Sequence, residues 1–458
     1  MTRLLLVGSG AREHAIAAAL TIQSDVELYA AMSSRNPGIA NLAKEAVVTK
    51  ITEPQLITDY AIKNRIELAV VGPEAPLVSG VVDALEALGV RSVGPKQRLA
   101  ALEGDKAFCR ELLNKHGIPG NPAYRIFTDP DSAESYLRTV GAVAIKPAGL
   151  TGGKGVKVSG EDFTSKGEEI AYAREVLQKR IGAIGKVVVE EKLEGEEYSM
   201  QAFVDGKNVY AMPLVQDHKR AYEGDGGPNT GGMGSYSDRN HLLPFVSQAD
   251  LELSSRIMDD VVRVLRQDMG EEYRGVLYGG FMLGKGAEEE KPTPKLIEFN
   301  CRFGDPEAMN VLPILSEQVD FAELCQRIAE GSLKERHVAF ERKATVCKYL
   351  VPAGYPEHAE PGQGISVNED ALTKSGGRVF YASVDIKDGQ VVTTTSRAVG
   401  VLGISDTIES AERVAEASTG FVAGPLRHRR DIGTAALVQK RIDHVKSLAS
   451  GLPLTKTL

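Results

Sequence analysis

The chain has 458 residues and a formal net charge of −8 at pH 7, with 42% hydrophobic and 25% charged residues. This composition is typical of a globular protein, and the length predicts about two to four domains. The acidic balance, with no long basic run, argues against nucleic acid or an anionic membrane as a partner. No stretch is apolar for long enough to cross a bilayer, and the first apolar run, Leu4 to Val7, is too short for a signal peptide.

The cysteines and glycines further limit the class of protein and its compartment. The four cysteines stand at 109, 301, 325 and 347 with no C-x-x-C spacing. This argues against a zinc ribbon or a disulfide framework and fits a reducing compartment, so we expect a cytoplasmic protein. The 47 glycines cluster in a few stretches, as they do in loops that approach a ligand.

Residues 1–104 alternate short apolar strands with helices. Strands are expected at 4–7, 26–31 and 68–71, and helices at 15–20 and 81–88. Such alternation predicts a doubly wound, Rossmann-like parallel sheet. The loop 72–76 follows a buried strand, so it should lie beside the first loop, 8–14, at the carboxyl ends of the strands.

The first loop, G-S-G-A-R-E-H, is similar to a dinucleotide fingerprint but fails it. Glu13 occupies the third glycine position, and no acid follows the second strand. What remains is G-x-G at a helix N-terminus with Arg12 and His14 beside it, which suits a phosphate group. A tight turn in which Glu13 caps the helix is the alternative, and the local sequence leaves both open.

A second glycine-rich loop, 147–155, lies between strands expected at 143–146 and 156–158. It is not a Walker motif, because Ala148 stands in place of glycine and no Ser or Thr follows Lys154. The pattern predicts a mobile strand–loop–strand lid whose backbone N–H groups and Lys154 face phosphates. Lys146 on the preceding strand is a second cation. A flexible surface hairpin with a solvated lysine is the alternative.

Two further segments place polar side chains between apolar ones. The strand 187–193 runs into E-G-E-E before a strand at 198–204. That pattern suits adenosine binding, although a charged hairpin turn is the commoner explanation. Residues 216–237 form a long glycine-rich loop in which Met233 and tyrosines alternate with charged residues, so we expect a folded active-site loop rather than disorder. His218 is expected to be solvated or ion-paired.

The stretch Lys295 to Glu307, K-L-I-E-F-N-C-R-F-G-D-P-E, carries the clearest chemistry. Glu298 and Asn300 share one face of an apolar strand, and such a pair of oxygen-bearing side chains suits a hard cation such as Mg²⁺. Arg302 adds a fork-shaped cation for a phosphate or carboxylate. Asp305-Pro306 predicts the N-cap and first residue of a helix. A strand end with solvated polar residues is the alternative.

From about residue 336 the pattern predicts a third, α/β domain. Strands are expected at 346–351, 378–386, 391–395 and 399–404, followed by a helix with residues 408, 411 and 415 on one face. Nothing in it suggests catalysis before Arg429-Arg430-Asp431, so we expect it to wall the active site. The predicted domains are 1–104, 105–335 with a lid subdomain at about 122–195, and 336–458.

Together these features suit phosphoryl transfer by positioning and charge neutralisation. They comprise two phosphate-suited glycine loops, several lysines and an acid–amide pair, with no Ser–His or Cys–His pair in a recognisable context. The separate phosphate loop in the first domain implies a second, phosphorylated substrate. A non-catalytic nucleotide-binding module is the alternative from another class, and the presence of both Lys146 and Glu298 argues against it.

The chain resembles the glycinamide ribonucleotide synthetases (phosphoribosylamine–glycine ligases) of the ATP-grasp superfamily over essentially its whole length. The motifs that carry the resemblance are G-S-G-A-R-E-H at 8–14, V-G-P-E-A-P-L at 71–77, L-E-G-D-K at 102–106, G-G-K-G-V at 152–156, Q-D-H-K-R at 216–220, G-P-N-T-G-G-M-G at 227–234, E-F-N-C-R-F-G-D-P-E at 298–307 and R-D-I-G at 430–433. R-F-G-D-P-E is a signature of this ligase. With Q-D-H-K-R, it argues against the alternative, another ATP-grasp carboxylate–amine ligase of purine metabolism.

The resemblance implies a central ATP-grasp domain and a reaction. ATP would phosphorylate the carboxylate of glycine to glycyl phosphate. The amine of 5-phosphoribosylamine would attack it, giving glycinamide ribonucleotide, ADP and phosphate in de novo purine (IMP) biosynthesis. The cofactors would be ATP and Mg²⁺ or Mn²⁺, and the partners only the small-molecule substrates. No assembly element stands out, so we expect a monomer.

The resemblance also assigns roles to residues, carried over one by one. The ATP phosphates would be bound by Lys106, Lys146 and Lys154, and the adenosine by Glu190, Leu193 and Glu197. The metal would be held by Glu298 and Asn300, and the phosphoribosylamine by Gly8, Gly10, Arg12, His14, Pro73 and Glu74. Asp217, Lys219 and Arg302 would act on glycine and the acyl phosphate.

Three positions depart from the family pattern. Ala11 stands where Gly is usual, Pro147-Ala148 where Ala-Asp is usual before the lid, and Met309 where a polar residue is frequent. The first would shift the phosphate loop slightly, and the second removes any role of that acid. None removes an expected metal ligand.

Overall fold

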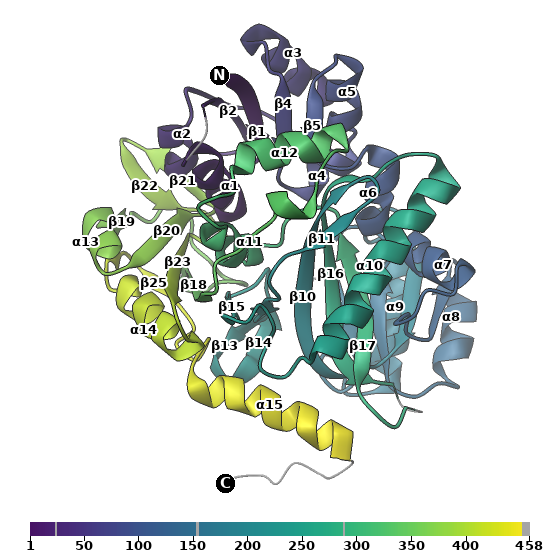
Figure 1. The fold of residues 1–458 in the computed structure, drawn as a ribbon. Helices are drawn as coiled ribbons and strands as arrows, with labels where there is room; N and C mark the ends of the chain where they lie inside the picture. The colour runs from purple at the N-terminus through teal and green to yellow at the C-terminus, as the bar shows by residue number, and fades with distance from the viewer. Residues whose placement is uncertain (23–24, 153–154, 287–288, 451–458) are drawn as a thin grey trace.

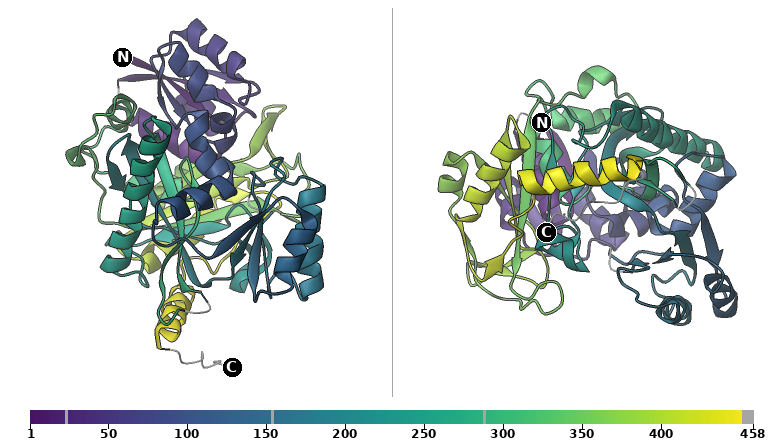
Figure 2. Two further views of the ribbon diagram at one scale, coloured as in Figure 1. Left: turned by 90° about the vertical axis from the view of Figure 1, so that its right-hand side faces the viewer. Right: turned by 90° about the horizontal axis from the view of Figure 1, so that it is seen from below.

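The structure is a computed structural model that describes residues 1–22, 25–152, 155–286 and 289–450. An N-terminal part, a central part with two sheets and a C-terminal part meet around the middle of the molecule (Figure 1). Seen from below, the last helix crosses the base of the molecule from the C-terminal part toward the central part (Figure 2). Among the described residues, every helix is too short or too polar to traverse a bilayer.

The N-terminal part confirms the predicted doubly wound sheet, whose five parallel strands run in the order β3-β2-β1-β4-β5. The strands are β1 (Thr2–Val7), β2 (Val26–Met32), β3 (Glu45–Val48), β4 (Leu68–Val71) and β5 (Arg91–Val93), and the helices are α1 (Ala11–Thr21), α2 (Pro37–Leu42), α3 (Pro54–Asn64), α4 (Glu74–Val78) and α5 (Val81–Ala87). Leu4 to Val7 are fully buried, as expected of a strand covered on both faces. The strand order reverses between β1 and β4, where ligands bind in such folds.

Two sheets make up the central part, the lid sheet (β6-β9-β7-β8) and the central sheet (β11-β10-β16-β17). The lid sheet contains β6 (Tyr124–Phe127), β7 (Val143–Pro147), β8 (Lys157–Val158) and β9 (Val187–Glu191), with helices α8 (Pro130–Leu137) and α9 (Lys166–Gln178). The central sheet contains β10 (Glu194–Asp205), β11 (Val209–Ala211), β16 (Arg274–Lys285) and β17 (Thr293–Asn300). Helices α6 (Gln97–Gly104) and α7 (Lys106–Lys115) lead into this part, and α10 (Gln248–Met269) lies along the central sheet (Figure 1).

The segment 216–237 is more regular than the predicted loop. It contains β12 (Gln216–Asp217), β13 (Arg220–Tyr222), the 3-10 helix η1 (Glu223–Asp225), β14 (Gly226–Asn229) and β15 (Gly234–Ser237). Strand β13 pairs with β14, while β12 pairs with β15, which pairs in turn with β18 (Ala344–Pro352). The local sequence could not reveal this order, because the partner strand lies far along the chain.

The C-terminal part is built on a sheet in the order β12-β15-β18-β23-β20, with β25 beside β18. Its further strands are β19 (Ser366–Val367), β20 (Gly377–Tyr381), β21 (Val384–Lys387), β22 (Gln390–Thr393), β23 (Val399–Ser405), β24 (Val422–Ala423) and β25 (Leu426–Arg427). Its helices are α13 (Glu369–Lys374), α14 (Ile408–Thr419) and α15 (Ala435–Ser450), and α11 (Glu307–Val311), η2 (Leu312–Ile314), α12 (Phe321–Glu330) and η3 (Glu335–His337) precede it. The strand predicted at 378–386 is two strands, β20 and β21.

One hydrophobic core runs through the N-terminal part, the central sheet and the β18 sheet. The lid sheet has a separate core, in which Val143, Ile145, Val176 and Val187 are buried against one another. A small apolar cluster of Ala107, Ala148 and Val188 joins the lid to α7, and the polar contacts described below join it to the central sheet.

Candidate active site

The end of β17 places Glu298 and Asn300 on one face of the strand. Asn300 Nδ2 donates to Glu298 Oε1 at 3.5 Å, and among the described residues this is the only hydrogen bond that the Glu298 carboxylate accepts. Burial raises the pKa of Glu298, but the positive field of nearby lysines outweighs burial and lowers it. These lysines are Lys219, Lys106 and Lys146. An ionised carboxylate is thus kept among cations with most of its hydrogen-bonding capacity unused.

Glu298 and Asn300 offer the oxygen ligands that a hard divalent cation prefers. Within the described ranges, no group of three or more His, Cys, Asp or Glu residues could hold a metal ion. A cation here would take its remaining ligands from phosphate oxygens and water, as Mg²⁺ commonly does. The two residues therefore fit Mg²⁺ or Mn²⁺ bound together with a polyphosphate.

Arg302, just beyond β17, joins the central part to the N-terminal part. Its Nε lies 3.3 Å from Glu74 Oε2, and its Nη2 lies 3.1 Å from Glu103 Oε1 and 3.2 Å from Asn300 Oδ1. Burial lowers the pKa of Arg302, but the two carboxylates outweigh burial and raise it. Burial raises the pKa of Glu74, but Arg302 and Arg12 outweigh it and lower the pKa to about 2. A fixed positive charge therefore stands beside the Asn300 amide.

The segment 305–307 differs from the prediction. Helix α11 begins at Glu307 with Pro306 as its N-cap, so Asp305 does not cap it. The Asp305 carboxylate instead accepts a hydrogen bond from Tyr349 Oη at 2.5 Å and pairs with Arg397 Nη2 at 3.2 Å. Two partners from the C-terminal part, one of them charged, outcompete the backbone N–H groups of a helical turn.

On the lid sheet, Lys146 and Glu190 form a buried cluster with Arg110. Lys146 Nζ lies 2.7 Å from Glu190 Oε2, and Arg110 Nε and Nη2 bind the two Glu190 oxygens at 2.8 and 2.9 Å. Burial raises the pKa of Glu190, but the two cations outweigh it and lower the pKa to about 2. The sequence analysis missed Arg110. The sequence feature that could have indicated it is a charged residue on the apolar face of α7, where Cys109 and Leu113 are also buried.

The other residues predicted to bind ATP lie on elements that adjoin this cluster. Lys106 begins α7, and its Nζ donates to a carbonyl of the lid loop at 3.3 Å. Leu193 is half-buried in the turn between β9 and β10, and Glu197 on β10 pairs with Lys219 at 2.7 Å. Lys154 lies outside the described residues.

Asp217 and Lys219 flank the buried His218. Asp217 Oδ1 accepts a hydrogen bond from the backbone N–H of His218 at 2.7 Å, and burial, together with nearby Glu307, raises the pKa of Asp217. Burial lowers the pKa of Lys219, but acidic neighbours that include Glu298 outweigh burial and raise it. The structure therefore brings this pair into the same charged environment as Glu298. His218 is buried and only 2% exposed, so of the two states expected for it, solvated or ion-paired, the solvated one is wrong.

The two N-terminal loops meet, as the crevice rule predicts. A Cβ added to Gly8 would lie 2.5 Å from Glu13 Cγ and 2.9 Å from Pro73 Cδ, and Gly8 has a φ of +132°, so the close approach requires glycine. Gly10 N donates to Glu13 Oε2 at 2.6 Å. Glu13 therefore caps α1, which begins at Ala11 rather than at residue 15.

Arg12 and His14 lie on the first turns of α1 and contact different parts of the molecule. Arg12 Nε donates to Glu13 Oε1 at 2.5 Å and its Nη1 to the carbonyl of Phe303 at 3.2 Å, within R-F-G-D-P-E. His14 Nδ1 accepts from the backbone N–H of Tyr381 at 3.0 Å, and the two rings stack. Burial lowers the pKa of His14 to about 4, so the ring is neutral at pH 7 with its proton on Nε2.

Arg397 is a site residue that the sequence analysis did not single out. Its Nη1 donates to the carbonyls of Gly231 and Gly232 at 2.7 and 3.0 Å, and its Nη2 pairs with Asp305. These partners lie between 92 and 166 residues away in the chain, so nothing in the local sequence could indicate them. The C-terminal part therefore does more than line the candidate site, because Arg397 also bonds to the glycine-rich loop and to Asp305.

The three departures from the family pattern all lie in packed surroundings. Ala11, Ala148 and Met309 are fully buried. The Ala148 carbonyl accepts the backbone N–H of Lys106 at 2.8 Å. A Cβ added to Gly400 would lie 2.8 Å from Met309 Sδ, so the methionine fills an apolar space against β23.

Comparison with known proteins covers nearly the whole chain. The phosphoribosylglycinamide synthetase N domain model matches residues 2–103, the ATP-grasp (A) domain model residues 104–308 and the C domain model residues 345–435. The phosphoribosylamine–glycine ligase of Methanosarcina barkeri is 48% identical over 447 residues, which is 97% of this chain and 99% of that protein.

Two solved structures are similar to the model. The crystal structure of phosphoribosylamine–glycine ligase from Thermotoga maritima aligns with a TM-score of 0.77 at 28% identity, covering 94% of this chain and 100% of that one. The biotin carboxylase domain of Hydrogenobacter thermophilus 2-oxoglutarate carboxylase, solved with MgADP and bicarbonate, aligns with a TM-score of 0.69 at 16% identity over 98% of this chain and 95% of that one, a likeness of fold alone. With its predicted α/β, ATP-grasp architecture confirmed, the chain belongs to the phosphoribosylglycinamide synthetase family.

Proposed function

We propose that the protein ligates glycine to 5-phosphoribosylamine at the expense of ATP, giving glycinamide ribonucleotide, ADP and phosphate in purine biosynthesis. The whole-length likeness to ligases of that name supports these substrates. The observation that carries the chemistry is the gathering of three lysines and Arg302, from separate elements, around the carboxylate of Glu298. Such a group of cations suits polyphosphate and the charge that develops during phosphoryl transfer.

In the first step, an oxygen of the glycine carboxylate attacks the γ-phosphorus of ATP, and the bond to ADP breaks. Lys106, Lys146 and Lys154 neutralise the phosphates, while Lys219 and Arg302 hold the glycine and the acyl phosphate. When bound, Mg²⁺ or Mn²⁺ at Glu298 and Asn300 supplies further charge neutralisation for the phosphates. The Lys219 and Arg302 charges are fixed at pH 7, since acidic neighbours raise both pKa values.

In the second step, the amine of phosphoribosylamine attacks the acyl carbon, phosphate leaves, and the amine loses a proton. Asp217 is proposed to accept that proton, because its half-buried carboxylate lies close to Lys219, which is proposed to hold the glycine. The two N-terminal loops hold the phosphate of this substrate. The residues proposed there are Gly8, Gly10, Arg12, His14, Pro73 and Glu74, and those proposed for the adenosine are Glu190, Leu193 and Glu197.

We propose the domain boundaries 1–104, 105–335 and 336–458, with a lid subdomain at about 122–195. The separate core of the lid sheet supports the subdomain. We also propose a cytoplasmic monomer without nucleic-acid or membrane partners. All four cysteines are free and buried, which supports a reducing compartment.

The test is phosphate release from ATP with glycine and freshly prepared phosphoribosylamine, omitting each in turn, with the product identified by mass. Release should require both substrates, and the product should contain the glycyl group. Release that proceeds without glycine, or with bicarbonate or formate in its place, would instead support another ATP-grasp carboxylate–amine ligase. Nucleotide binding without any release would support a binding module.

A further inference from the structure

We propose that Arg429 is a positioning residue for the ligation, because it holds the segment 216–222, which carries Asp217 and Lys219, beside the central sheet. The inference rests on the function proposed above and deepens it. Arg429 lies some 200 residues further along the chain than this segment. Its contacts, and those of its neighbours in 427–431, carry the argument.

Arg429 has no exposed side-chain surface, and its guanidinium bonds to two residues of the 216–225 region and to one residue of its own turn. Its Nη1 donates to the carbonyl of Arg220 at 3.0 Å, and its Nη2 lies 3.1 Å from Asp225 Oδ1. Its Nε and Nη2 bind the two oxygens of Asp431 at 2.9 and 2.7 Å. A buried cation with this many acceptors is held in one geometry.

The stretch 427–431 alternates in what it contacts, as an extended backbone requires. Arg427 donates to the carbonyl of Ala221 at 2.9 Å, and Asp431 accepts the backbone N–H of Gly224 at 3.0 Å, so both act on the same region as Arg429. His428 and Arg430 face Glu416 on α14 instead, at 3.1 and 3.8 Å. The odd-numbered side chains of 427–431 therefore contact the region 220–225, whereas the side chains of His428 and Arg430 do not. Arg430 reaches this region only through its backbone N–H, which donates to Glu223 Oε1 at 3.3 Å.

The segment 216–219 alternates in the same way. Gln216 and His218 are each 2% exposed, whereas Asp217 and Lys219 are half-buried. Gln216 Nε2 donates to the carbonyl of Glu197 at 3.0 Å, and Lys219 Nζ lies 2.7 Å from Glu197 Oε2. Gln216 and Lys219 thus anchor the segment on β10, whereas His218 Nδ1 lies 3.4 Å from the carbonyl of Gly234 on β15. Asp217 and Lys219 are only half-buried and so remain available to substrate.

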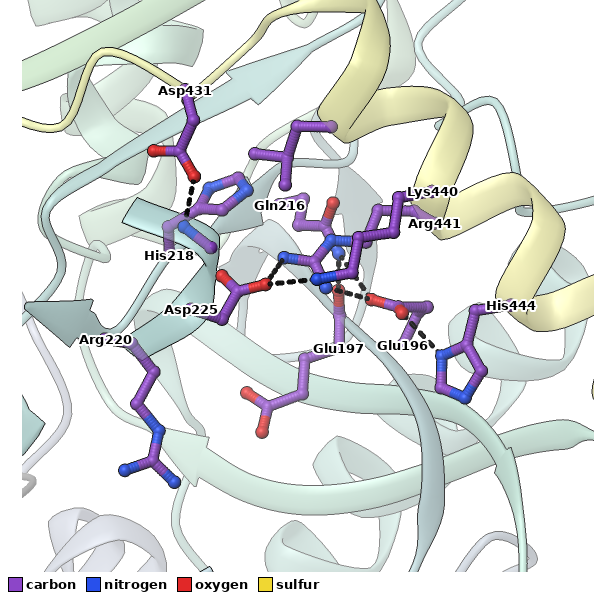
Figure 3. A network of polar contacts seen from close by, with 12 residues as sticks. Glu196, Glu197, Gln216, His218, Arg220, Asp225, Asp431, Lys440, Arg441 and His444 are labelled. Carbon is purple, nitrogen blue, oxygen red and sulfur yellow. Dashed lines mark hydrogen bonds and ion pairs between the residues drawn. The ribbon is translucent and has the colours of Figure 1, made fainter. Parts of the chain in front are cut away.

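Helix α15 also contacts this arrangement, with Arg441 lying between Asp225 and Glu196 (Figure 3). Arg441 pairs with Asp225 at 2.6 Å and with Glu196 at 3.3 Å, and His444 Nδ1 lies 2.6 Å from Glu196 Oε1. Glu196 therefore points toward α15, while its neighbour Glu197 pairs with Lys219. The C-terminal part holds both the segment and the strand against which the segment lies.

Removal of the Arg429 guanidinium takes the donor from the Arg220 carbonyl and leaves Asp225 and Asp431 without their shared cation. Lys219 then loses its fixed place relative to Glu197. A displacement of about 1 Å at a reacting group can lower a rate about a hundredfold. ATP should still bind, because Lys106 and Lys146 lie on α7 and β7.

The experiment compares Arg429→Ala and Arg429→Lys with Arg430→Ala in the full-length enzyme. Arg430 has a side chain that is 77% exposed, so its removal changes the net charge equally without touching the segment. Per folded enzyme, Arg429→Ala should lower kcat at least about tenfold and raise the KM for glycine, while the ATP dissociation constant changes less than about twofold. The kcat of Arg429→Lys should lie between that of Arg429→Ala and that of Arg430→Ala, since one ammonium group cannot bond to all three partners of the guanidinium.

Kinetic constants of Arg429→Ala within about twofold of those of Arg430→Ala would overturn the proposal. Should Arg429→Ala not fold, amide hydrogen exchange at 218–224 in Asp431→Asn decides: exchange faster than in Arg430→Ala supports the positioning role, and unchanged exchange overturns it. Failure of the proposed function is separate, because it appears as absent glycine-dependent phosphate release in the unmodified enzyme. The exchange comparison still tests the positioning in that case.

Discussion

Two carboxylates, Glu190 on the lid sheet and Glu298 on the central sheet, both lie near Lys146 but differ in how many hydrogen bonds they accept. Both oxygens of Glu190 are bound by Arg110 and Lys146 at 2.7–2.9 Å. Glu298 has one hydrogen bond of 3.5 Å, and no cation within ion-pair distance among the residues described. A buried carboxylate with all its oxygens bound stabilises the structure, whereas one left open among cations is suited to a ligand.

The satisfied carboxylate also has a mechanical role. Arg110 Nη1 and Nη2 donate to the carbonyls of Leu296 and Ile297 at 3.0 and 2.7 Å, and Lys146 Nζ donates to the latter at 3.3 Å. The lid sheet, which has its own hydrophobic core, is thus joined to β17 through the Glu190 cluster. Glu190 connects the lid to the strand that carries Glu298.

The largest expected effect is that of Glu298→Gln. Removing this charge should lower kcat at least about a thousandfold, or about 4 kcal/mol, because the carboxylate is proposed to hold the metal. The free energy of unfolding should fall less than in Glu190→Gln, since among the described residues Glu298 has no ion pair to lose. Phosphate-release kinetics and urea denaturation measure the two. Near-normal activity of Glu298→Gln would show that Glu298 does not hold the metal, and the proposed difference in role between Glu298 and Glu190 would then be wrong.

Glu190→Gln should lower stability more than Glu298→Gln does, and it should also weaken ATP binding, because Glu190 is proposed to contact the adenosine. The substitution leaves two buried cations without their carboxylate, so the free energy of unfolding should fall by about 3 kcal/mol. Equilibrium urea denaturation measures this change. Glu298→Gln is the matched control, because it is the same substitution on the central sheet instead of the lid sheet. A Glu190 variant as stable as the unmodified protein would show that the cluster is not structural.

Arg302→Lys tests a residue that lies between these extremes, since it is paired with Glu74 and Glu103 yet stands beside Asn300. A lysine cannot form the forked contacts, so we expect kcat/KM to fall about a hundredfold, or about 2.7 kcal/mol. Titration of the rate against each substrate shows which one is affected. If only stability falls, Arg302 belongs with Glu190 rather than with Glu298.

His14 sharpens the comparison because burial acts there without a compensating charge. Its pKa is about 4 in the folded protein against an ordinary 6.5. The unfolded chain therefore binds more protons between these values, and the free energy of unfolding falls as the pH is lowered through that window. Between pH 7 and 5 the contribution is about 2 kcal/mol.

The substitution His14→Gln keeps an acceptor for the Tyr381 N–H but does not titrate. Urea denaturation at pH 7 and 5 should therefore show a smaller loss of stability in the variant than in the unmodified protein. Other titrating groups contribute equally to both proteins and cancel. An identical pH dependence in the two proteins would contradict the neutral, buried state of the ring.

Sequence patterns predicted the parts of the site that depend on near neighbours. The shared face of Glu298 and Asn300 follows from strand periodicity, and the meeting of loops 8–10 and 72–73 follows from the parallel topology. The partners of Arg110, Arg397 and Arg429 could not be found in this way, because they lie 80, 166 and 209 residues distant in the chain.

The expected helix cap at Asp305 failed for the same reason. Its local preference was correct for an isolated segment, but Tyr349 and Arg397 reach the carboxylate from the C-terminal part. The solvated state expected of His218 was likewise a property of its polar neighbours in sequence, which the pairing of β12 with β15 overrides. Local sequence preference determines the state of a side chain only where long-range partners are absent, and Asp305 and His218 both have such partners.

The strand pairing between β15 and β18 has a consequence for how the chain reaches its native state. During synthesis β15 is complete at Ser237, whereas its partner begins only at Ala344. Until then the edge of β15 that later receives β18 is open to any other strand, and such edges recruit foreign chains. Shortened chains that end before Ala344 should therefore aggregate even though they contain every residue proposed to bind ATP.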